Sequence, residues 1–329
     1  MMIPMMELIS SPAQDPNDDW VVEEMKSADF GDKRLHKRLL LILRRLFDAP
    51  ATGLKAAFKG WAELMAAYRF FDNDKVDEGA LLESHVAATL ERVRAQSRAL
   101  VLQDTTELDY STKKALQGTG ALSVEVRQGF FAHSQYVVTP QRLPLGLWGT
   151  KIYAREKTME ADKGVEKRDV PIEEKESFRW LEGYRDACHL AELAPQTQVI
   201  SVNDREGDIY EVFVEWQRRR EQGERVAEWL IRSCHDRCLM PFEERQVNAE
   251  GVEWPAKLRA AVEQSPLLGT VKFYVARHEG TKKAKGGKGV IKKIRKARHV
   301  EQEIRALEAD QVRYEQELDA YRSRQPPIT

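Results

Sequence analysis

Two short apolar runs that each lead to an aspartate constrain the fold of this chain more than any other feature of its sequence. Residues 199–202 form one run, which ends at Asn203 and Asp204, and residues 99–102 form another, which leads through Gln103 to Asp104. Short apolar runs that stop at polar residues predict buried strands, and ligands of open α/β sheets lie beyond the carboxyl ends of such strands. Two strand-borne carboxylates in one sheet are the minimum needed to hold a divalent metal, so we expect a site there.

The length and charge of the chain bound its function class. Its 329 residues suffice for two or three domains with a sizeable core. The net charge is −1 although 32% of the residues are charged, so attraction to a polyanion must come from local basic clusters. Residues 1–16 contain Glu7 and no basic segment, and no later segment has the length of a transmembrane helix. We expect a cytoplasmic protein with no membrane partner.

The three cysteines allow two interpretations. Cys188-His189, Cys234-His235 and Cys238 are residue types that bind zinc. The spacing is loose, however, and no second Cys-x-x-Cys supports it, so buried or incidental thiols are the preferred interpretation. An odd number of cysteines also argues against a disulfide framework.

A helical domain with one basic surface is expected at residues 19–96, after a disordered leader at residues 1–18. The spacing of Leu35, Leu39, Ile42 and Leu46 predicts an amphipathic helix, and further helices are expected at residues 55–71 and 77–95. The opposite face of the amphipathic helix carries Lys33, Arg34, Lys37, Arg38, Arg44 and Arg45. An ordinary solvated face is the alternative, but acidic partners at helical spacing are absent after Asp32. A small helical domain with a basic surface is a common format for nucleic-acid binding.

Residues 97–238 are expected to form an α/β core. Strands are predicted at residues 99–106, 129–139, 145–153, 199–203 and 226–233, with helices at 174–193 and 209–220, the latter capped by Asp208. Three strands, helix, strand, helix, strand is the layout of a ribonuclease-H-like mixed sheet, in which the first and fourth strands are neighbours. That order places Asp104 beside Asp204.

The last third of the chain differs in character. A strand is predicted near residues 271–276, followed by residues 281–298, which hold nine basic residues, among them Lys292, Lys293 and Arg295, and no acidic one. This basic loop suits a phosphate backbone, with a flexible solvated loop as the alternative. Residues 300–329 show alternating spacings of four and three, which predict a C-terminal amphipathic helix.

Four motifs in this order resemble one known family. They are Asp19-Trp20 with Phe30-Gly31-Asp32-Lys33-Arg34 and Arg38-Leu39, then Ala66-Ala67-Tyr68-Arg69-Phe70-Phe71-Asp72-Asn73, then Gln103-Asp104-Thr105-Thr106, and finally Asp204-Arg205-Glu206-Gly207-Asp208-Ile209. Over residues 19–240 the chain is similar to the DDE transposases of bacterial insertion sequences, the branch typified by the transposon-five transposase.

The resemblance implies a specific chemistry. A ribonuclease-H-like core of this family cuts transposon ends with two Mg²⁺ ions, for which Mn²⁺ can substitute, held by two aspartates and a glutamate. Asp104 and Asp204 are then the metal ligands, and Arg205 and Arg232 contact phosphate. Arg34, Lys37 and Arg38 grip double-stranded DNA at the terminal repeats. Partners would be a full-length transposase copy or a second copy on DNA, in the bacterial cytoplasm and on the nucleoid.

The sequence departs from the family at its end. The family marks its glutamate by Tyr, two residues, Arg, three residues and Glu, whereas Tyr314 has Glu317 in place of the arginine and Tyr321-Arg324 has Ile328 in place of the glutamate. The β-rich insertion expected at residues 239–299 is incomplete. We expect a truncated or frame-shifted product, with a genuine short product as the alternative. The function is then a transposase, or a catalytically inactive DNA-binding protein or inhibitor; a nuclease acting on RNA hybrids leaves the helical domain without a role.

Overall fold

The computed structural model describes residues 19–50, 52–113, 116–124, 126–155, 170–237, 257–275, 278–283, 290–295 and 298–305. The expected leader, Cys238 and residues 306–329 of the expected tail lie outside this description. The chain divides into two units, Met1–Ser233 and Cys234–Thr329, which are described separately.

The first unit begins with a helical part. Its helices are α1 (Trp20–Glu24), α2 (Lys33–Asp48), α3 (Leu54–Ala57), α4 (Trp61–Phe71) and α5 (Glu78–Arg94). Asp32 caps α2 by accepting the N–H of Arg34, and Leu39 and Ile42 are buried, which confirms the predicted apolar stripe. The prediction of one helix over residues 55–71 is wrong because Gly60, at φ 108°, interrupts it between α3 and α4.

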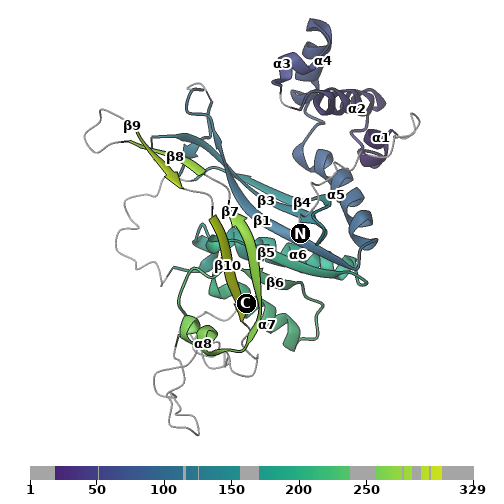
Figure 1. Cartoon of the computed structure of the whole chain (residues 1–329). Coiled ribbons are helices and arrows are strands. Elements are labelled where there is room, and N and C mark those ends of the chain that lie inside the picture. Colours follow the sequence, from purple (N-terminus) through teal and green to yellow (C-terminus); the bar gives the residue numbers. More distant parts are fainter. Residues whose placement is uncertain are drawn as a thin grey trace, which may run out of the picture. The chain divides into compact units, whose positions relative to one another are not determined.

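The second part of this unit is a mixed sheet (Figure 1). Its strands are β1 (Arg98–Asp109), β2 (Gly120–Ala121), β3 (Gln128–Val138), β4 (Pro144–Tyr153), β5 (Gln198–Asn203) and β6 (Glu228–Ile231). The order is β2-β3-β1-β5-β6, and β4 also pairs with β3. β1 is antiparallel to β3 and parallel to β5, which is parallel to β6. The predicted adjacency of the first and fourth long strands is therefore confirmed.

Helices α6 (Phe178–Leu193) and α7 (Tyr210–Glu221) bury one face of the sheet. Val101 and Val199 point into the same apolar cluster as Tyr184 and Leu190 of α6. Short 3-10 turns, η2 (Ile172–Glu174) and η3 (Arg205–Gly207), precede the two helices. The predicted cap of α7 at Asp208 is wrong: Ile209 is the N-cap, and Asp208 is buried in the turn that follows η3.

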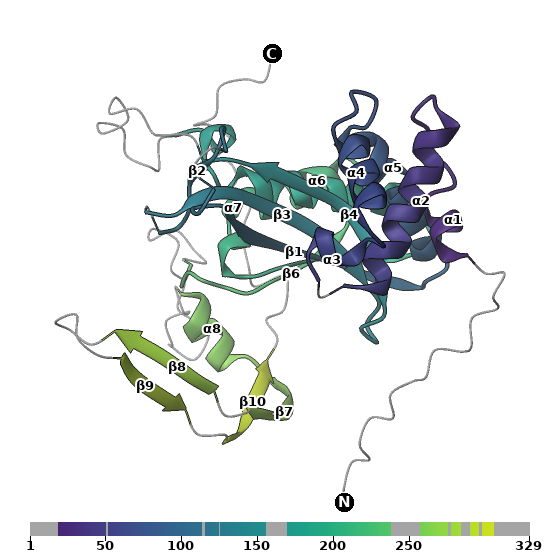
Figure 2. The same cartoon turned by 90° about the horizontal axis from the view of Figure 1, so that it is seen from above.

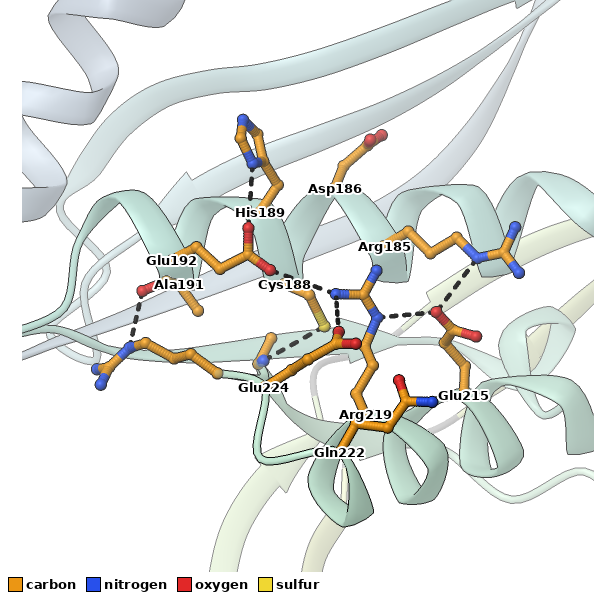
Figure 3. A network of polar contacts seen from close by, with 12 residues as sticks. Arg185, Asp186, Cys188, His189, Ala191, Glu192, Glu215, Arg219, Gln222 and Glu224 are labelled. Atoms are coloured by element: carbon orange, nitrogen blue, oxygen red, sulfur yellow. Dashed lines mark hydrogen bonds and ion pairs between the residues drawn. The ribbon is translucent and has the colours of Figure 1, made fainter.

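A polar network fastens α7 to α6 (Figure 3). Glu215 of α7 lies at its centre, where it pairs with Arg218 at 3.0 Å, Arg219 at 2.8 Å and Arg185 of α6 at 3.4 Å. Burial of Glu215 opposes its ionisation, but the hydrogen bonds from Arg218 and Arg219 and the charge of Arg185 outweigh it and lower its pKa to about 2. The two helices are therefore held together by charge as well as by apolar packing.

The second unit contains α8 (Leu258–Gln264) and two strand pairs (Figure 2). β7 (Leu267–Val275) pairs with β10 (Arg298–Arg305), and β8 (His278–Lys283) pairs with β9 (Val290–Arg295), both antiparallel. Residues 300–305 therefore form a strand, and the helix predicted from Val300 is wrong there. Val300 and Ile304 fit two-residue as well as four-residue spacing, and β7, rich in β-formers, supplies a partner.

The basic loop predicted over residues 281–298 is also corrected in part. Lys292, Lys293 and Arg295 lie in β9, where Lys292 pairs with Thr281 and Lys293 with Gly280. The β-branched residues of β9 favour a strand over a loop. None of the helices in the described part of the chain combines the length and apolar character that a bilayer-spanning segment needs.

Candidate functional site

Two parallel pairings, β1 with β5 and β5 with β6, bring three of the predicted site residues together. Gln103 of β1 is the register partner of Asn203 in β5, and Asn203 is the partner of Ile231 in β6. The next residues are Asp104, Asp204 and Arg232, so they follow one another across the sheet, about 4.8 Å from strand to strand. The N–H of Arg232 donates to the carbonyl oxygen of Asn203 at 3.1 Å, which continues this order beyond the strands.

Both carboxylates are exposed, and each accepts one backbone N–H. Asp104 Oδ1 accepts from the N–H of Thr105 at 2.8 Å, and Asp204 Oδ1 accepts from the N–H of Glu206 at 2.8 Å. A carboxylate has about four acceptor positions, so this bond leaves capacity for a cation. Neither group is turned into the apolar core.

Behind the carboxylates lies a buried polar network that sequence reasoning missed. His133 of β3 contacts the hydroxyl of Thr105 at 2.9 Å and Oε1 of Gln103 at 3.2 Å. The amide of Gln103 donates to Ser201 Oγ of β5 at 2.9 Å, so the network links β1, β3 and β5. Burial, together with the charges of Arg179 and Lys151, lowers the pKa of His133 to about 4. The ring is therefore neutral at pH 7.

The donor set fits part of a magnesium site. Mg²⁺ prefers oxygen ligands, and it commonly takes one or two carboxylates and completes its shell with water and substrate phosphates. Asp104 and Asp204 match that requirement. In the part of the chain that the structure describes, no group of three or more His, Cys, Asp or Glu side chains suits a metal.

The cysteines do not gather into a zinc site among the described residues. Cys188 is buried in the core, where Sγ accepts the N–H of Ala227 at 3.4 Å, and burial raises the pKa of its thiol. Cys234 is exposed. The preferred interpretation of Cys188 as a buried structural thiol agrees with this environment.

Helix α2 carries the predicted basic surface. Arg34 and Lys37 are exposed and Arg38 is half-buried. Arg34 pairs with Asp32 at 2.9 Å in an exposed contact, whereas neither Lys37 nor Arg38 forms an ion pair within the described ranges. Arg34, Lys37 and Arg38 can therefore meet a phosphate backbone without breaking a buried contact.

The other two arginines of α2 have partners from outside the helix. Arg44 pairs with Asp19, and Arg45 pairs with Glu63 of α4 at 3.0 Å. These two cations hold the helical part together, through acidic residues that lie outside the helix and that helical spacing could not reveal. The accessible charge is concentrated at the first half of α2.

The remaining predicted phosphate contacts lie at two places. Arg205 is exposed in η3, directly after Asp204, and Arg232 is exposed directly after β6. Lys292, Lys293 and Arg295 belong to β9 of the second unit.

The helical part is bonded to the sheet through α5. Glu24 of α1 pairs with Arg92 of α5 at 2.7 Å, and the Arg92 guanidinium donates to the carbonyl oxygen of Leu145 in β4. His85 of α5 contacts Glu24 and also accepts the N–H of Leu147 at 2.8 Å. The basic helices and the sheet are therefore joined by polar contacts.

The fold is that of a mixed α/β protein in which a helical domain with a basic surface is bonded to the sheet, and two exposed carboxylates follow paired residues of two parallel strands. Residues 17–76 match a family model described as transposase DNA-binding. The match spans α1 to α4 and supports DNA binding by a transposase, with DNA as the partner. The predicted helical DNA-binding domain is confirmed to that extent.

Proposed function

We propose that this chain is a DDE transposase of bacterial insertion sequences, similar to the transposon-five branch. Its helical domain binds transposon ends, and its sheet supplies two carboxylates of a two-metal site that cuts and joins DNA strands. The observation that carries the proposal is the register of β1 and β5, in which Asp104 and Asp204 directly follow the paired residues Gln103 and Asn203. The transposase DNA-binding match at residues 17–76 supports the same function.

The strand order supports a ribonuclease-H-like core. Three antiparallel strands, β1, β3 and β4, are followed by β5 and β6, which add parallel to the free side of β1. In this order the first and fourth long strands are neighbours, as a carboxylate pair directly after their last paired residues requires.

On this proposal, Asp104 and Asp204 hold Mg²⁺, or Mn²⁺ in its place, by carboxylate oxygens. A metal bound there would activate a water or a DNA 3′-hydroxyl as the nucleophile and would stabilise the leaving oxygen. Arg232 and Arg205, both exposed beside Asp204, bind phosphate oxygens of the DNA and hold the strand against the carboxylates.

Arg34, Lys37 and Arg38 of α2 bind the terminal repeats, because these cations are accessible and close together on one helix. β9 with Lys292, Lys293 and Arg295 offers further contacts to the phosphate backbone. A second copy, or a longer transposase chain, on the same DNA is the expected protein partner.

The experiment has two stages. Repeated selection from random-sequence duplexes first identifies the DNA that the full chain prefers. A labelled duplex with that sequence is then incubated with Mg²⁺ or Mn²⁺ and the parent chain, Asp104→Asn or Asp204→Asn. We expect selective binding by all three proteins, and weak cutting by the parent alone, because two carboxylates leave the second metal poorly held.

The outcomes separate this proposal from its alternative. Cutting that disappears in both aspartate variants supports a transposase. Selective binding without cutting, and without metal binding that depends on either aspartate, indicates a DNA-binding protein or inhibitor. Robust cutting by the parent chain would contradict the claim that its second metal is poorly held.

A further inference from the structure

One guanidinium reaches the segments that follow both aspartates. Arg179, in the first turn of α6, donates from Nε to the hydroxyl of Thr105 at 3.1 Å. Its Nη2 donates to the carboxylate of Glu206 at 2.8 Å. Nη1 donates to the carbonyl oxygen of Glu176 at 2.6 Å, which fixes the guanidinium on its own element. The side chain of Arg179 is only 10% exposed, so these contacts are largely shielded from water.

The two residues that Arg179 holds are the two that orient the aspartates. Thr105 donates its backbone N–H to Asp104, and Glu206 donates its backbone N–H to Asp204. Each aspartate is therefore oriented by a backbone group whose own side chain is bonded to Arg179. Arg179 therefore contacts the residues that orient both carboxylates.

The buried polar network around His133 also restrains Thr105. The hydroxyl of Thr105 also contacts His133, which contacts Gln103, and Gln103 donates to Ser201. Within the described residues, the side chain of Glu206 bonds Arg179 alone and is 63% exposed. Arg179 is therefore the stronger restraint on the Asp204 side, where η3 is a single short turn.

We propose that Arg179 is a positioning residue for the Asp104–Asp204 pair, holding both carboxylates in the spacing that one divalent cation needs. This inference rests on the proposed function, because the cation is the one that the transposase site requires. The planar fork of arginine donates to Thr105 and Glu206 at once, whereas a lysine ammonium presents one centre and cannot span both.

The test measures metal binding by the full chain, without DNA cutting. Mn²⁺ is titrated into the parent, Arg179→Ala and Arg179→Lys, and the free ion is counted by electron paramagnetic resonance. We expect Arg179→Ala to raise the dissociation constant about tenfold, as is usual for groups that orient metal ligands, with Arg179→Lys in between. Asp104→Asn and Asp204→Asn should lose most of the binding.

The matched control is Arg225→Ala. Arg225 also uses its guanidinium for two structural bonds, to the carbonyl oxygens of Ala191 and Thr197, but at the opposite end of β5. Its loss should lower the melting temperature and leave Mn²⁺ affinity unchanged. If Arg179→Ala does not fold, two other variants test the same contacts. Glu206→Ala removes the bond to Arg179, and Thr105→Val removes the bonds of the hydroxyl to Arg179 and His133. We expect about a threefold weakening from either.

The outcomes distinguish the two proposals. Unchanged Mn²⁺ affinity in Arg179→Ala, while both aspartate variants lose binding, overturns the role of Arg179 and leaves the metal site intact. Parent binding that does not depend on Asp104 and Asp204 overturns the proposed site, and the positioning role with it. A tenfold loss in Arg225→Ala as well would show that affinity follows stability alone and would also overturn the inference.

Discussion

Asp104 and Asp204 each lie one residue beyond Gln103 and Asn203, the last register pair of two neighbouring parallel strands. Their chain separation of 100 residues is closed by the parallel pairing of β1 and β5. Both side chains are exposed, so neither adds buried contacts to the core. The pair is therefore more consistent with a ligand site than with a contribution to stability.

Replacing either aspartate by asparagine should affect function and spare the fold. Both side chains are exposed, and asparagine keeps the oxygen that accepts the backbone N–H of Thr105 or Glu206. We expect metal binding to fall while the melting temperature moves by no more than about 2 °C. Calorimetry on the parent and both variants checks this, and a large drop in melting temperature would indicate a structural role.

Neutralising the basic half of α2 should weaken DNA binding and reduce its salt dependence. Replacing Arg34, Lys37 and Arg38 by alanine removes three cations, so the slope of log affinity against log salt should become less steep by about 2 to 3. Fluorescence anisotropy over a range of KCl concentrations measures it. A control with the same charge change replaces Lys26, Lys113 and Arg220, and equal weakening there would refute a specific surface.

The buried imidazole of His133 predicts a loss of stability on mild acidification. Its pKa is lowered to about 4 in the folded state, against about 6.5 when unfolded. The unfolded state therefore binds more protons between these values, so stability falls as the pH drops from 6.5 to 4, by up to about 3 kcal/mol. Urea unfolding across this range should show that the free energy of unfolding of the parent falls with decreasing pH. In His133→Gln this pH dependence should disappear.

The low pKa of Glu215 predicts a second loss of folding stability, at lower pH. Its folded pKa is about 2 and its unfolded value is 4.5, so its stabilising contribution is present above pH 4.5 and is lost as the pH falls toward 2. Glu215 is buried, but two of its partners, Arg185 and Arg218, are 42% and 39% exposed, so solvent screens these pairs. We therefore expect Glu215→Gln to cost about 2 kcal/mol at pH 7. Glu192→Gln, at the exposed rim of the same network (Figure 3), should cost less than half as much.

Gly146 predicts a steric effect between α5 and β4. It has φ 138°, and an added Cβ would lie 2.1 Å from Thr89 Oγ1 and 3.0 Å from the Arg92 guanidinium. Gly223 has φ 72° and open space, so Gly223→Ala carries only backbone strain, of about 1 kcal/mol. We expect Gly146→Ala to cost at least about 2 kcal/mol more in urea unfolding. An equal loss of stability in both variants would show that the contact between α5 and β4 rearranges to accommodate the added methyl group.

Much of the fold was predictable because its elements follow strong periodic patterns. The stripe through Leu39 and Ile42 marked α2, and the apolar run before Asn203 marked β5. The prediction was wrong where two patterns coincide or where a single residue overrides a pattern. Val300 and Ile304 satisfy both helical and strand spacing, and Gly60 breaks a helix that its neighbours would continue.

The sequence predicted that Asp104 and Asp204 would be neighbours on adjacent strands, and their parallel pairing confirms this, although β1 continues past Asp104 to Asp109. It did not identify what orients them. Arg179 lies 74 residues from Thr105, and nothing in the pattern of α6 distinguishes it from other arginines. A partial signal existed: Gln103 and His133 are polar residues at buried positions of β1 and β3, where alternation favours apolar ones. Polar groups at such positions indicate a hydrogen-bonded network before any contact is known.

The junction of α5 with β4 has a mechanical consequence. His85 and Arg92 both bond the backbone of β4 while they also hold Glu24 of α1. These bonds reach Leu145 and Leu147, on both sides of Gly146. A force that bound DNA exerts on the first helices is therefore passed to the sheet through hydrogen bonds, and not through a flexible linker.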